Sequence, residues 1–436
     1  MNTALDIEAV REGRSTRLRR LQYVFTGFCA MSIAVNFLDR ATISVAALPI
    51  RHDFGLTATE VGGLISVWSI SYSLGQLPAG FLVDRFGPRL LAGLGMLLWS
   101  ICQGAGGLTR SFTQLFWLRS ALGVAEAPTG PSNARVVATW FPPHERGVPT
   151  GVYVCGTAIG PAIAPPVLTA LMLALGWRAM FVTMGLVGVV ASMCWFLLYR
   201  EPSAAGLSVA ERDRVLAHRP DDAARIGPRT WGRLFRSPTV LGIIFGSFAQ
   251  GFVVWIYGGW LPAFLETQYH ESMQRTGVLA ALPWIGGIIG ALSGGYISDL
   301  LIRRGHGPVS SRKLPIVAGL AGLALFTGFA GLSGSAPAAI AFIFLALLCG
   351  AVTTAAMWAA ATILVPSGYV ASLGAIINFA AFLGATCSPV LTGFIVDATG
   401  SFDLALLIGA AVGLIGAMFF AAMIRAPVTA AEIEGR

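Results

Sequence analysis

Residues 80–89 read Gly-Phe-Leu-Val-Asp-Arg-Phe-Gly-Pro-Arg, a short polar segment between two long apolar stretches. No Asp, Glu, Lys or Arg interrupts the chain between Glu60 and Asp84 before this segment, or between Arg89 and Arg110 after it. A helix needs roughly 20 apolar residues to cross the hydrocarbon core of a bilayer, so each stretch is long enough to span a membrane. The segment is therefore predicted to be a tight turn between two membrane-spanning helices.

The same spacing of glycine and aspartate returns in the second part of the chain. It occurs as Gly295-x-x-x-Asp299 followed by Arg303-Arg304, and as a weaker copy in Gly393-x-x-x-Asp397-x-x-Gly400. Each copy follows a long apolar stretch. Internal repeats of this kind are typical of transporters built from two related bundles about an axis along the membrane normal.

Most of the chain is predicted to lie in lipid. Of its 436 residues, 55% are hydrophobic and only 11% are charged, whereas soluble domains carry about 25% charged residues. Seven charge-free stretches hold one helix each, the stretch from Leu314 to Val396 holds three, and residues 21–50 and 112–139 add two helices with charges inside them. The predicted fold is all-α and integral to the membrane, with twelve transmembrane helices in two pseudo-symmetric halves of six.

The longest polar segment, Tyr199 to Ser237, divides the predicted helices six and six. It is rich in charge and reads as a solvated linker with room for one surface helix. The predicted organisation is a tail (1–20), an N-terminal six-helix bundle (21–199), a linker (200–237), a C-terminal six-helix bundle (238–425) and a second tail (426–436).

The net charge of +8 reflects membrane topology rather than a nucleic-acid partner. Arg and Lys collect on cytoplasmic loops, and 23 of the 29 are assigned to one side, which makes both termini cytoplasmic in a bacterial inner membrane. The six cysteines lie singly in apolar stretches, with no metal-ligand spacing. No cofactor is predicted apart from a coupling proton, and we expect a monomer.

Several segments give the chain a specific resemblance. Segment 80–89 resembles the signature loop between helices 2 and 3 of the major facilitator superfamily. Further pieces resemble its anion:cation symporter branch, which includes importers of sugar acids and aromatic acids and vesicular glutamate and sialic-acid transporters: Asn36-Phe-Leu-Asp-Arg-Ala-Thr42, Trp140-Phe-Pro-Pro-His-Glu-Arg146, Trp260-Leu-Pro262, Gly374-Ala-Ile-Ile-Asn-Phe379, Ser388-Pro-Val-Leu-Thr-Gly-Phe394 and Thr399-Gly-Ser-Phe402. The resemblance covers essentially the whole chain and implies transport of an organic anion.

Four ionisable residues are predicted deep within the membrane, on helices 1 and 4: Asp39, Arg40, Arg119 and Glu126. Such groups are costly in lipid and usually serve a cavity or a partner. A carboxyl group whose pKa responds to burial and to a nearby guanidinium can carry a proton, which makes Asp39 and Glu126 the coupling candidates. Arg40 is the expected anchor for a substrate carboxylate, because a guanidinium binds it through two parallel N–H bonds. Arg119 is expected to tune Glu126.

The family resemblance implies roles for further residues. Tyr72, Thr157, Trp358 and Asn378 match positions that line the substrate cavity of sugar-acid transporters. The expected gating residues are those of the repeated loops: Gly80, Asp84, Arg85, Gly87, Arg89 and Asp299. In that interpretation, Asp84 accepts bonds at the amino end of a neighbouring helix. Pro88 departs from the basic residue common in the loop.

The favoured function is proton-coupled uptake of a small organic carboxylate. An enzyme is disfavoured because the five histidines fall in loops or at helix ends, and a receptor because no sizeable soluble domain is present. The alternatives are anion exchange and drug export by antiport, the second suggested by Gly156-x-x-x-Gly160-Pro161. The resemblance implies Tyr in many relatives where this chain has Phe37, and a sugar-acid importer can carry Gln where it has Thr157. We therefore expect an anion with few hydroxyls, such as an aromatic or short aliphatic acid, unless Thr157 faces a neighbouring helix.

Overall fold

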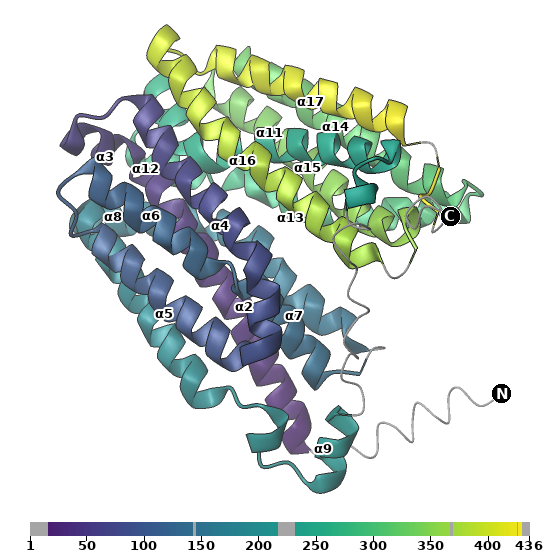
Figure 1. Cartoon of the computed structure of the whole chain (residues 1–436). Coiled ribbons are helices and arrows are strands. Elements are labelled where there is room, and N and C mark those ends of the chain that lie inside the picture. The colour runs from purple at the N-terminus through teal and green to yellow at the C-terminus, as the bar shows by residue number, and fades with distance from the viewer. Residues whose placement is uncertain (1–15, 143–144, 217–231, 367–368, 425, 430–436) are drawn as a thin grey trace.

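The computed structural model describes residues 16–142, 145–216, 232–366, 369–424 and 426–429 (Figure 1). The described residues form helices and connecting turns, with no strand among them. The predicted N-terminal bundle contains α2 (Thr16–Val45), α3 (Ala47–Phe54), α4 (Ala58–Phe86), α5 (Pro88–Gly106), α6 (Phe112–Glu126), α7 (Thr129–Trp140) and α8 (Gly147–Leu198). The linker adds a 3-10 turn, η2 (Pro202–Ala204), and the expected surface helix, α9 (Val209–Leu216).

The predicted C-terminal bundle is also helical. It contains α11 (Pro238–Gln268), α12 (Met273–Leu279), α13 (Leu282–Arg303), α14 (Pro308–Gly331), α15 (Ala336–Leu364), α16 (Val370–Thr399) and α17 (Asp403–Met423). In Figure 1 the purple-to-teal helices lie on one side of the molecule and the green-to-yellow helices on the other. The two bundles are joined by the linker.

The number of membrane crossings agrees with the prediction. Eight helical stretches in the described chain are long and apolar enough to span a bilayer. One of them is α8, which turns at Gly176, where φ is 80°, and therefore supplies two crossings. With α4, α5 and the α6–α7 pair, the described residues make twelve crossings.

Local sequence explains where these helices begin and end. Thr57 caps α4 in a reciprocal pair with Glu60, which satisfies backbone donors that the first helical turn leaves free. Gly87, with φ of 81°, joins α4 to α5, and Pro88 starts α5 at a position where its missing N–H costs nothing. Segment 80–89 thus contains a sharp turn between two helices.

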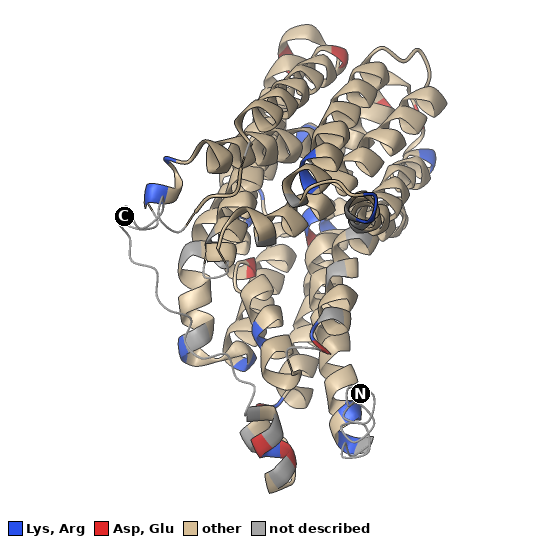
Figure 2. Cartoon of the chain, turned by 90° about the vertical axis from the view of Figure 1, so that its right-hand side faces the viewer, with Lys and Arg blue, Asp and Glu red and all other residues tan. Residues whose placement is uncertain are grey.

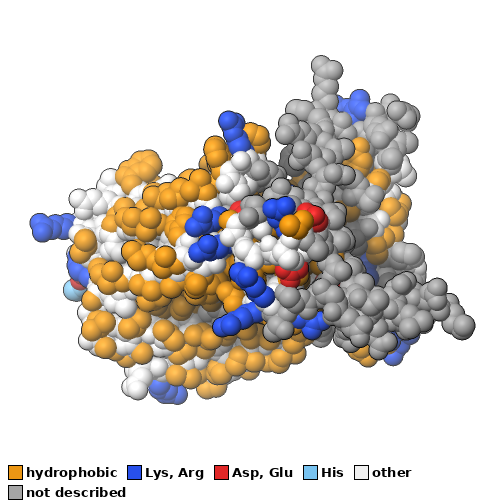
Figure 3. Space-filling model, turned by 90° about the horizontal axis from the view of Figure 1, so that it is seen from below, with side chains coloured by type: hydrophobic (Ala, Val, Ile, Leu, Met, Phe, Trp, Pro, Cys, Tyr) orange, Lys and Arg blue, Asp and Glu red, His pale blue; other side chains and the backbone are white. Residues whose placement is uncertain are grey.

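The outside of the described bundle suits lipid. Leu197, Leu292 and Met418 expose 71%, 73% and 62% of their surfaces, and apolar exposure on this scale marks contact with a membrane or a partner. Figure 2 shows helices that are tan along most of their length, with charged segments mainly toward their ends and a small group inside. Hydrophobic side chains also cover much of the described surface seen in Figure 3.

The two bundles meet most closely where α3 and α12 lie, which we call the closed end (Figure 1). There α4 packs along α16, and α8 packs against α12 and α13. Gly393 lies so close to the first turn of α4 that an added Cβ would sit 2.3 Å from the carbonyl oxygen of Ala58. The absent side chain therefore lets α16 and α4 touch across the interface between the bundles.

Candidate ligand cavity and the buried charge cluster

The arginine on helix α2 pairs with the acid at the end of α6. Arg40 Nε lies 3.0 Å from Glu126 Oε2, and the indole of Trp68 donates to the same oxygen at 2.9 Å. Glu126 is fully buried, and its Oε1 has no hydrogen-bond partner among the described residues. It is also the last residue of α6, and the helix is interrupted for two residues before α7 begins at Thr129. The predicted anchor and one predicted coupling acid are thus in direct contact.

Aromatic rings surround the guanidinium of Arg40. Its Cζ lies 5.0, 4.3 and 4.8 Å from the ring centroids of Phe37, Trp68 and Tyr72. Cation–π contact holds the group without using its N–H donors. Only Nε is bonded to an acid, and Nη1 and Nη2 have no hydrogen-bond partner in the described chain. The guanidinium can therefore still bind a carboxylate.

Asp39 adjoins Arg40 in sequence but lies away from it in space. Its buried carboxylate accepts a hydrogen bond from Trp99 Nε1 at 3.1 Å on α5, and its Oδ1 has no partner among the described residues. Consecutive residues on a helix differ by about 100° in direction, which sends the two charges to different sides of α2. Asp39 is absent from the described cavity lining, which includes Arg40.

Arg119 lies within the same buried cluster. Its side chain is 2% exposed, and Nη1 donates to the backbone carbonyl of Asp39 at 3.4 Å. Within the described residues it forms no ion pair shorter than 4.0 Å. The predicted tuning of Glu126 by Arg119 therefore involves no direct contact and would act through its charge alone.

A cavity of about 250 Å³ lies between the two bundles beside this cluster. Its wall in the N-terminal bundle includes Phe37, Arg40, Ser44, Thr157 and Pro161. The facing wall in the C-terminal bundle includes Val254, Trp255, Gly258, Trp284 and Phe382. A concave, mostly apolar site with a single charged group is typical of a small-ligand pocket.

Three predicted cavity residues lie elsewhere. Tyr72 stacks on Trp68 beside Arg40 but is not part of the described cavity wall. Asn378 donates to Gln76 Oε1 at 3.1 Å, so its amide joins α16 to α4. Trp358 is 47% exposed on α15, with its ring against Gly374. Trp358 and Asn378 are absent from the described lining of this cavity, and their role in substrate binding stays a prediction.

The sequence interpretation missed several aromatic residues at the site. Trp68 holds Glu126, Trp99 holds Asp39, and Trp255, Trp284 and Phe382 form much of the facing wall. A tryptophan in an apolar stretch gives no spacing signal that separates a cavity wall from ordinary packing. The burial of four ionisable groups was a usable hint, because buried carboxylates require donors nearby.

The predicted gating loop is described in part. Gly80 lies on α4, and Arg85 stacks on the ring of Phe86 at 5.4 Å. Arg89 bonds the backbone carbonyl of Phe196 at 2.9 Å, which ties α5 to α8. The side chains of Asp84 and Asp299 lie outside the described residues, so the proposed latch at Asp84 stays a prediction.

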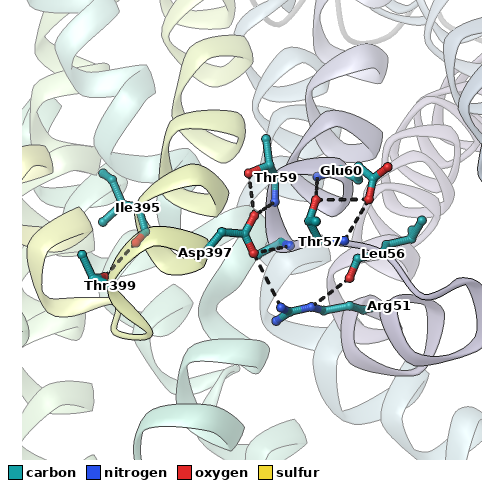
Figure 4. A network of polar contacts seen from close by, with 9 residues as sticks. Arg51, Leu56, Thr57, Thr59, Glu60, Ile395, Asp397 and Thr399 are labelled. Atoms are coloured by element: carbon teal, nitrogen blue, oxygen red, sulfur yellow. Dashed lines mark hydrogen bonds and ion pairs between the residues drawn. The ribbon is translucent and has the colours of Figure 1, made fainter.

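The second copy of the glycine-aspartate spacing makes a contact at the closed end (Figure 4). Asp397, near the end of α16, accepts hydrogen bonds from the backbone N–H groups of Ala58 and Thr59 at 2.8 and 2.7 Å. Arg51 lies 3.6 Å from the same carboxylate. An acid at a helix N-terminus satisfies free donors and complements the helix dipole. The C-terminal bundle therefore caps a helix of the N-terminal bundle.

Comparison with known proteins identifies the family of the chain. Residues 29–310 match the Major Facilitator Superfamily. The chain is 39% identical over 433 residues to the "Probable L-galactonate transporter" of Escherichia coli, covering 98% of this chain and 95% of that protein. It is 30% identical to the "Probable galactarate/D-glucarate transporter" of Bacillus subtilis, covering 91% and 89%.

A solved structure agrees with the fold. The crystal structure of a D-xylose-proton symporter superposes with a TM-score of 0.73 at 15% identity, covering 95% of this chain and 99% of that one. At this identity the likeness shows the fold alone. The family match and the relatives named for sugar acids agree with the resemblance found in the sequence. The chain belongs to the major facilitator superfamily and is a multi-pass membrane transporter, not an enzyme.

Proposed function

We propose that this transporter takes up a small organic carboxylate together with protons by alternating access. The observation that carries the proposal is the position of Arg40, which lines the cavity and donates from Nε to Glu126. Its Nη1 and Nη2 have no hydrogen-bond partner among the described residues. A carboxylate in the cavity would take those two donors as a bidentate pair. The guanidinium of Arg40 would then take part in both substrate binding and proton coupling.

The coupling follows from competition for Arg40. An ionised Glu126 already supplies one negative charge to the guanidinium at 3.0 Å. Protonation of Glu126 removes that charge, so the guanidinium gains affinity for an anion in the cavity. Asp39 is the second proposed proton carrier. It is buried, and its Oδ1 has no hydrogen-bond partner among the described residues. Substrate and proton would therefore bind together and leave together.

The proposed orientation of the chain in the membrane rests on the charge distribution. Placing the side with 23 of the 29 Lys and Arg residues in the cytoplasm sets both termini there, within a bacterial inner membrane. The closed end, with α3 and α12, would then face the periplasm. Alternating access requires this end to open for substrate entry.

Two observations bear on the substrate. The relatives named for galactonate and for galactarate or glucarate support a sugar acid. A substrate with few hydroxyl groups is supported by Phe37 and Thr157, which both lie on the cavity wall. The family resemblance implies the more polar Tyr and Gln at these positions in related transporters. Each buried hydroxyl without a partner costs about 1 to 3 kcal/mol. The chemistry shared by both readings is a small acid whose carboxylate binds Arg40.

Drug export by antiport gains little from the structure. The glycines of its motif have a packing role, since a Cβ on Gly156 would lie 2.8 Å from Ile33 and one on Gly160 would lie 2.5 Å from Phe37. The motif's closing glycines are replaced by Ala164 and Pro165. These glycines let α8 approach α2, whichever direction transport takes.

The decisive variants separate proton coupling from substrate exchange. In proteoliposomes, Glu126→Gln and Asp39→Asn should each abolish accumulation driven by a pH gradient. Glu126→Gln should retain counterflow of the same acid, because exchange requires no net proton movement. Glu60→Gln is the matched control, since Glu60 caps α4 far from the cavity. Unchanged accumulation in both coupling variants would show that Asp39 and Glu126 do not carry the coupling protons.

A further inference from the structure

We propose that the cavity selects singly charged carboxylates over dicarboxylates. This inference rests on the proposed function, in which the substrate is a carboxylate held by Arg40. It distinguishes two acid classes that occur among the relatives, because galactonate carries one carboxylate and galactarate carries one at each end.

The first step is the charge of the cavity wall. Among the described residues that line it, Arg40 is the single cationic side chain. The facing wall offers Val254, Gly258, Leu261 and Trp284, which are uncharged. An acid bound through one carboxylate at Arg40 would therefore direct its far end toward apolar side chains and indoles.

The second step is that no other described cation lines this wall. Arg119 is 2% exposed and is directed to the backbone of Asp39. In the C-terminal bundle, Arg275 on α12 pairs with Glu271. Lys313, in the second turn of α14, donates to the carbonyl of Ile424 directly after the end of α17. Neither lines the cavity. A second carboxylate would lose its hydration and find no charge partner.

The third step is the difference that this makes between two acids of one shape. A hydroxyl at the far end that loses its water partner is disfavoured far less than a buried carboxylate without a charge partner. At the cavity wall the charges agree, since protonation of Glu126 leaves the charge of Arg40 for the substrate, and one carboxylate neutralises it. The second carboxylate of a dianion would lie among the uncharged side chains of the facing wall.

The test uses matched pairs that differ by one carboxylate. Purified wild-type protein in proteoliposomes would be assayed by competition and counterflow with galactonate and galactarate, gluconate and glucarate, butyrate and succinate, and benzoate and terephthalate. At about pH 7 both carboxyls of each diacid are ionised. The monoacid of the pair that binds should compete at least 10-fold better than its diacid, which corresponds to about 1.4 kcal/mol.

The outcomes separate this inference from the proposed function. Equal or stronger competition by the diacids, with monoacids still transported, overturns the single-charge inference and leaves carboxylate transport standing. Failure of every acid to bind removes the proposed function and the inference with it.

A gain-of-function variant gives an independent arm. The three atoms nearest to a Cβ on Gly258, outside its own stretch of helix, all belong to the Trp255 ring at 3.4 to 3.9 Å, so this cavity-wall position has room. Gly258→Lys would add a cation facing Arg40, and Gly258→Met adds similar bulk without charge. We expect Gly258→Lys to narrow the monoacid preference at least threefold and Gly258→Met to leave it unchanged. A folded Gly258→Lys protein with the wild-type preference contradicts the inference.

Discussion

Asp397 on α16 accepts two hydrogen bonds from Thr59 on α4, one from the backbone N–H at 2.7 Å and one from the hydroxyl at 2.6 Å. These residues belong to different bundles and lie 338 positions apart. Gly393, one helical turn before Asp397, lets the two helices approach. The weak sequence copy of the gating loop therefore marks a contact that must break before the closed end can open.

The first prediction concerns this contact. Asp397→Ala removes a helix cap worth about 0.5 to 2 kcal/mol, so the ratio of open to closed molecules at this end should rise roughly 2- to 30-fold. Spin labels at His52 and His270, exposed sites on the two bundles, would report the change as longer distances in pulsed electron resonance. The Arg51 pair should contribute little, because its side chain is 39% exposed.

Asp403→Ala is the matched control for that experiment. Asp403 also lies at a helix N-terminus, but its carboxylate bonds Gln268 of the same bundle at 3.1 Å. Its removal should leave the distance distribution between bundles unchanged. Identical distributions for Asp397→Ala and the wild type would show that the contact does not hold the closed end together.

The second prediction concerns the anchor. Arg40→Lys keeps the positive charge but loses the planar pair of donors. A hydrogen bond to a charged group contributes about 1.5 to 3 kcal/mol, so apparent affinity for the transported acid should fall roughly 10- to 100-fold. Equilibrium binding at fixed pH measures the loss. Normal affinity in this variant would place the carboxylate somewhere other than Arg40.

The third prediction concerns hydroxyl recognition. Thr157 lies on the cavity wall, so Thr157→Gln should add hydrogen-bonding capacity and improve competition by galactonate relative to butyrate or benzoate about threefold or more. Thr157→Leu is the control, since it changes size without adding an amide. If wild-type protein already prefers galactonate-like acids over benzoate-like and small aliphatic acids, the expectation of few hydroxyls is wrong.

The fourth prediction concerns topology. Reporter fusions at Arg225 and Arg436, which lie outside the described residues, should be cytoplasmic, and a fusion near Arg178 should be periplasmic. The asymmetry of Arg and Lys is the physical reason. A periplasmic signal at Arg225 would invert the proposed orientation and the assignment of the closed end.

Sequence reasoning found the fold and the main charges for identifiable reasons. Apolar stretches as long as α15 and α17 cannot be exposed to water, so they predict membrane-spanning helices. Four ionisable residues within predicted membrane-spanning helices are rare enough to indicate a functional site. The sequence did not decide which acid meets Arg40, because that depends on how α2 and α6 rotate against each other. Asp39 and Arg40 are adjacent in the sequence, yet their side chains bind different neighbours in the folded chain.

Other features depend on contacts that no spacing encodes. Trp68 and Trp99 bind the two acids from α4 and α5, yet each is one aromatic residue in an apolar helix. Asn378 is hydrogen-bonded across the bundles to Gln76, a contact that the sequence pattern does not indicate. Asp397 was visible only as a weak copy of a motif, and its partner at the start of α4 became apparent in the folded chain.

The most direct test of proton-coupled carboxylate uptake uses wild-type protein in proteoliposomes and a labelled acid that the competition panel shows to bind. With the interior made alkaline, the acid should accumulate above its external concentration, and a protonophore should return it to that concentration. Protein-free liposomes correct for passive entry of permeant acids. Equal internal and external concentrations under the same gradient, with counterflow intact, would contradict proton coupling.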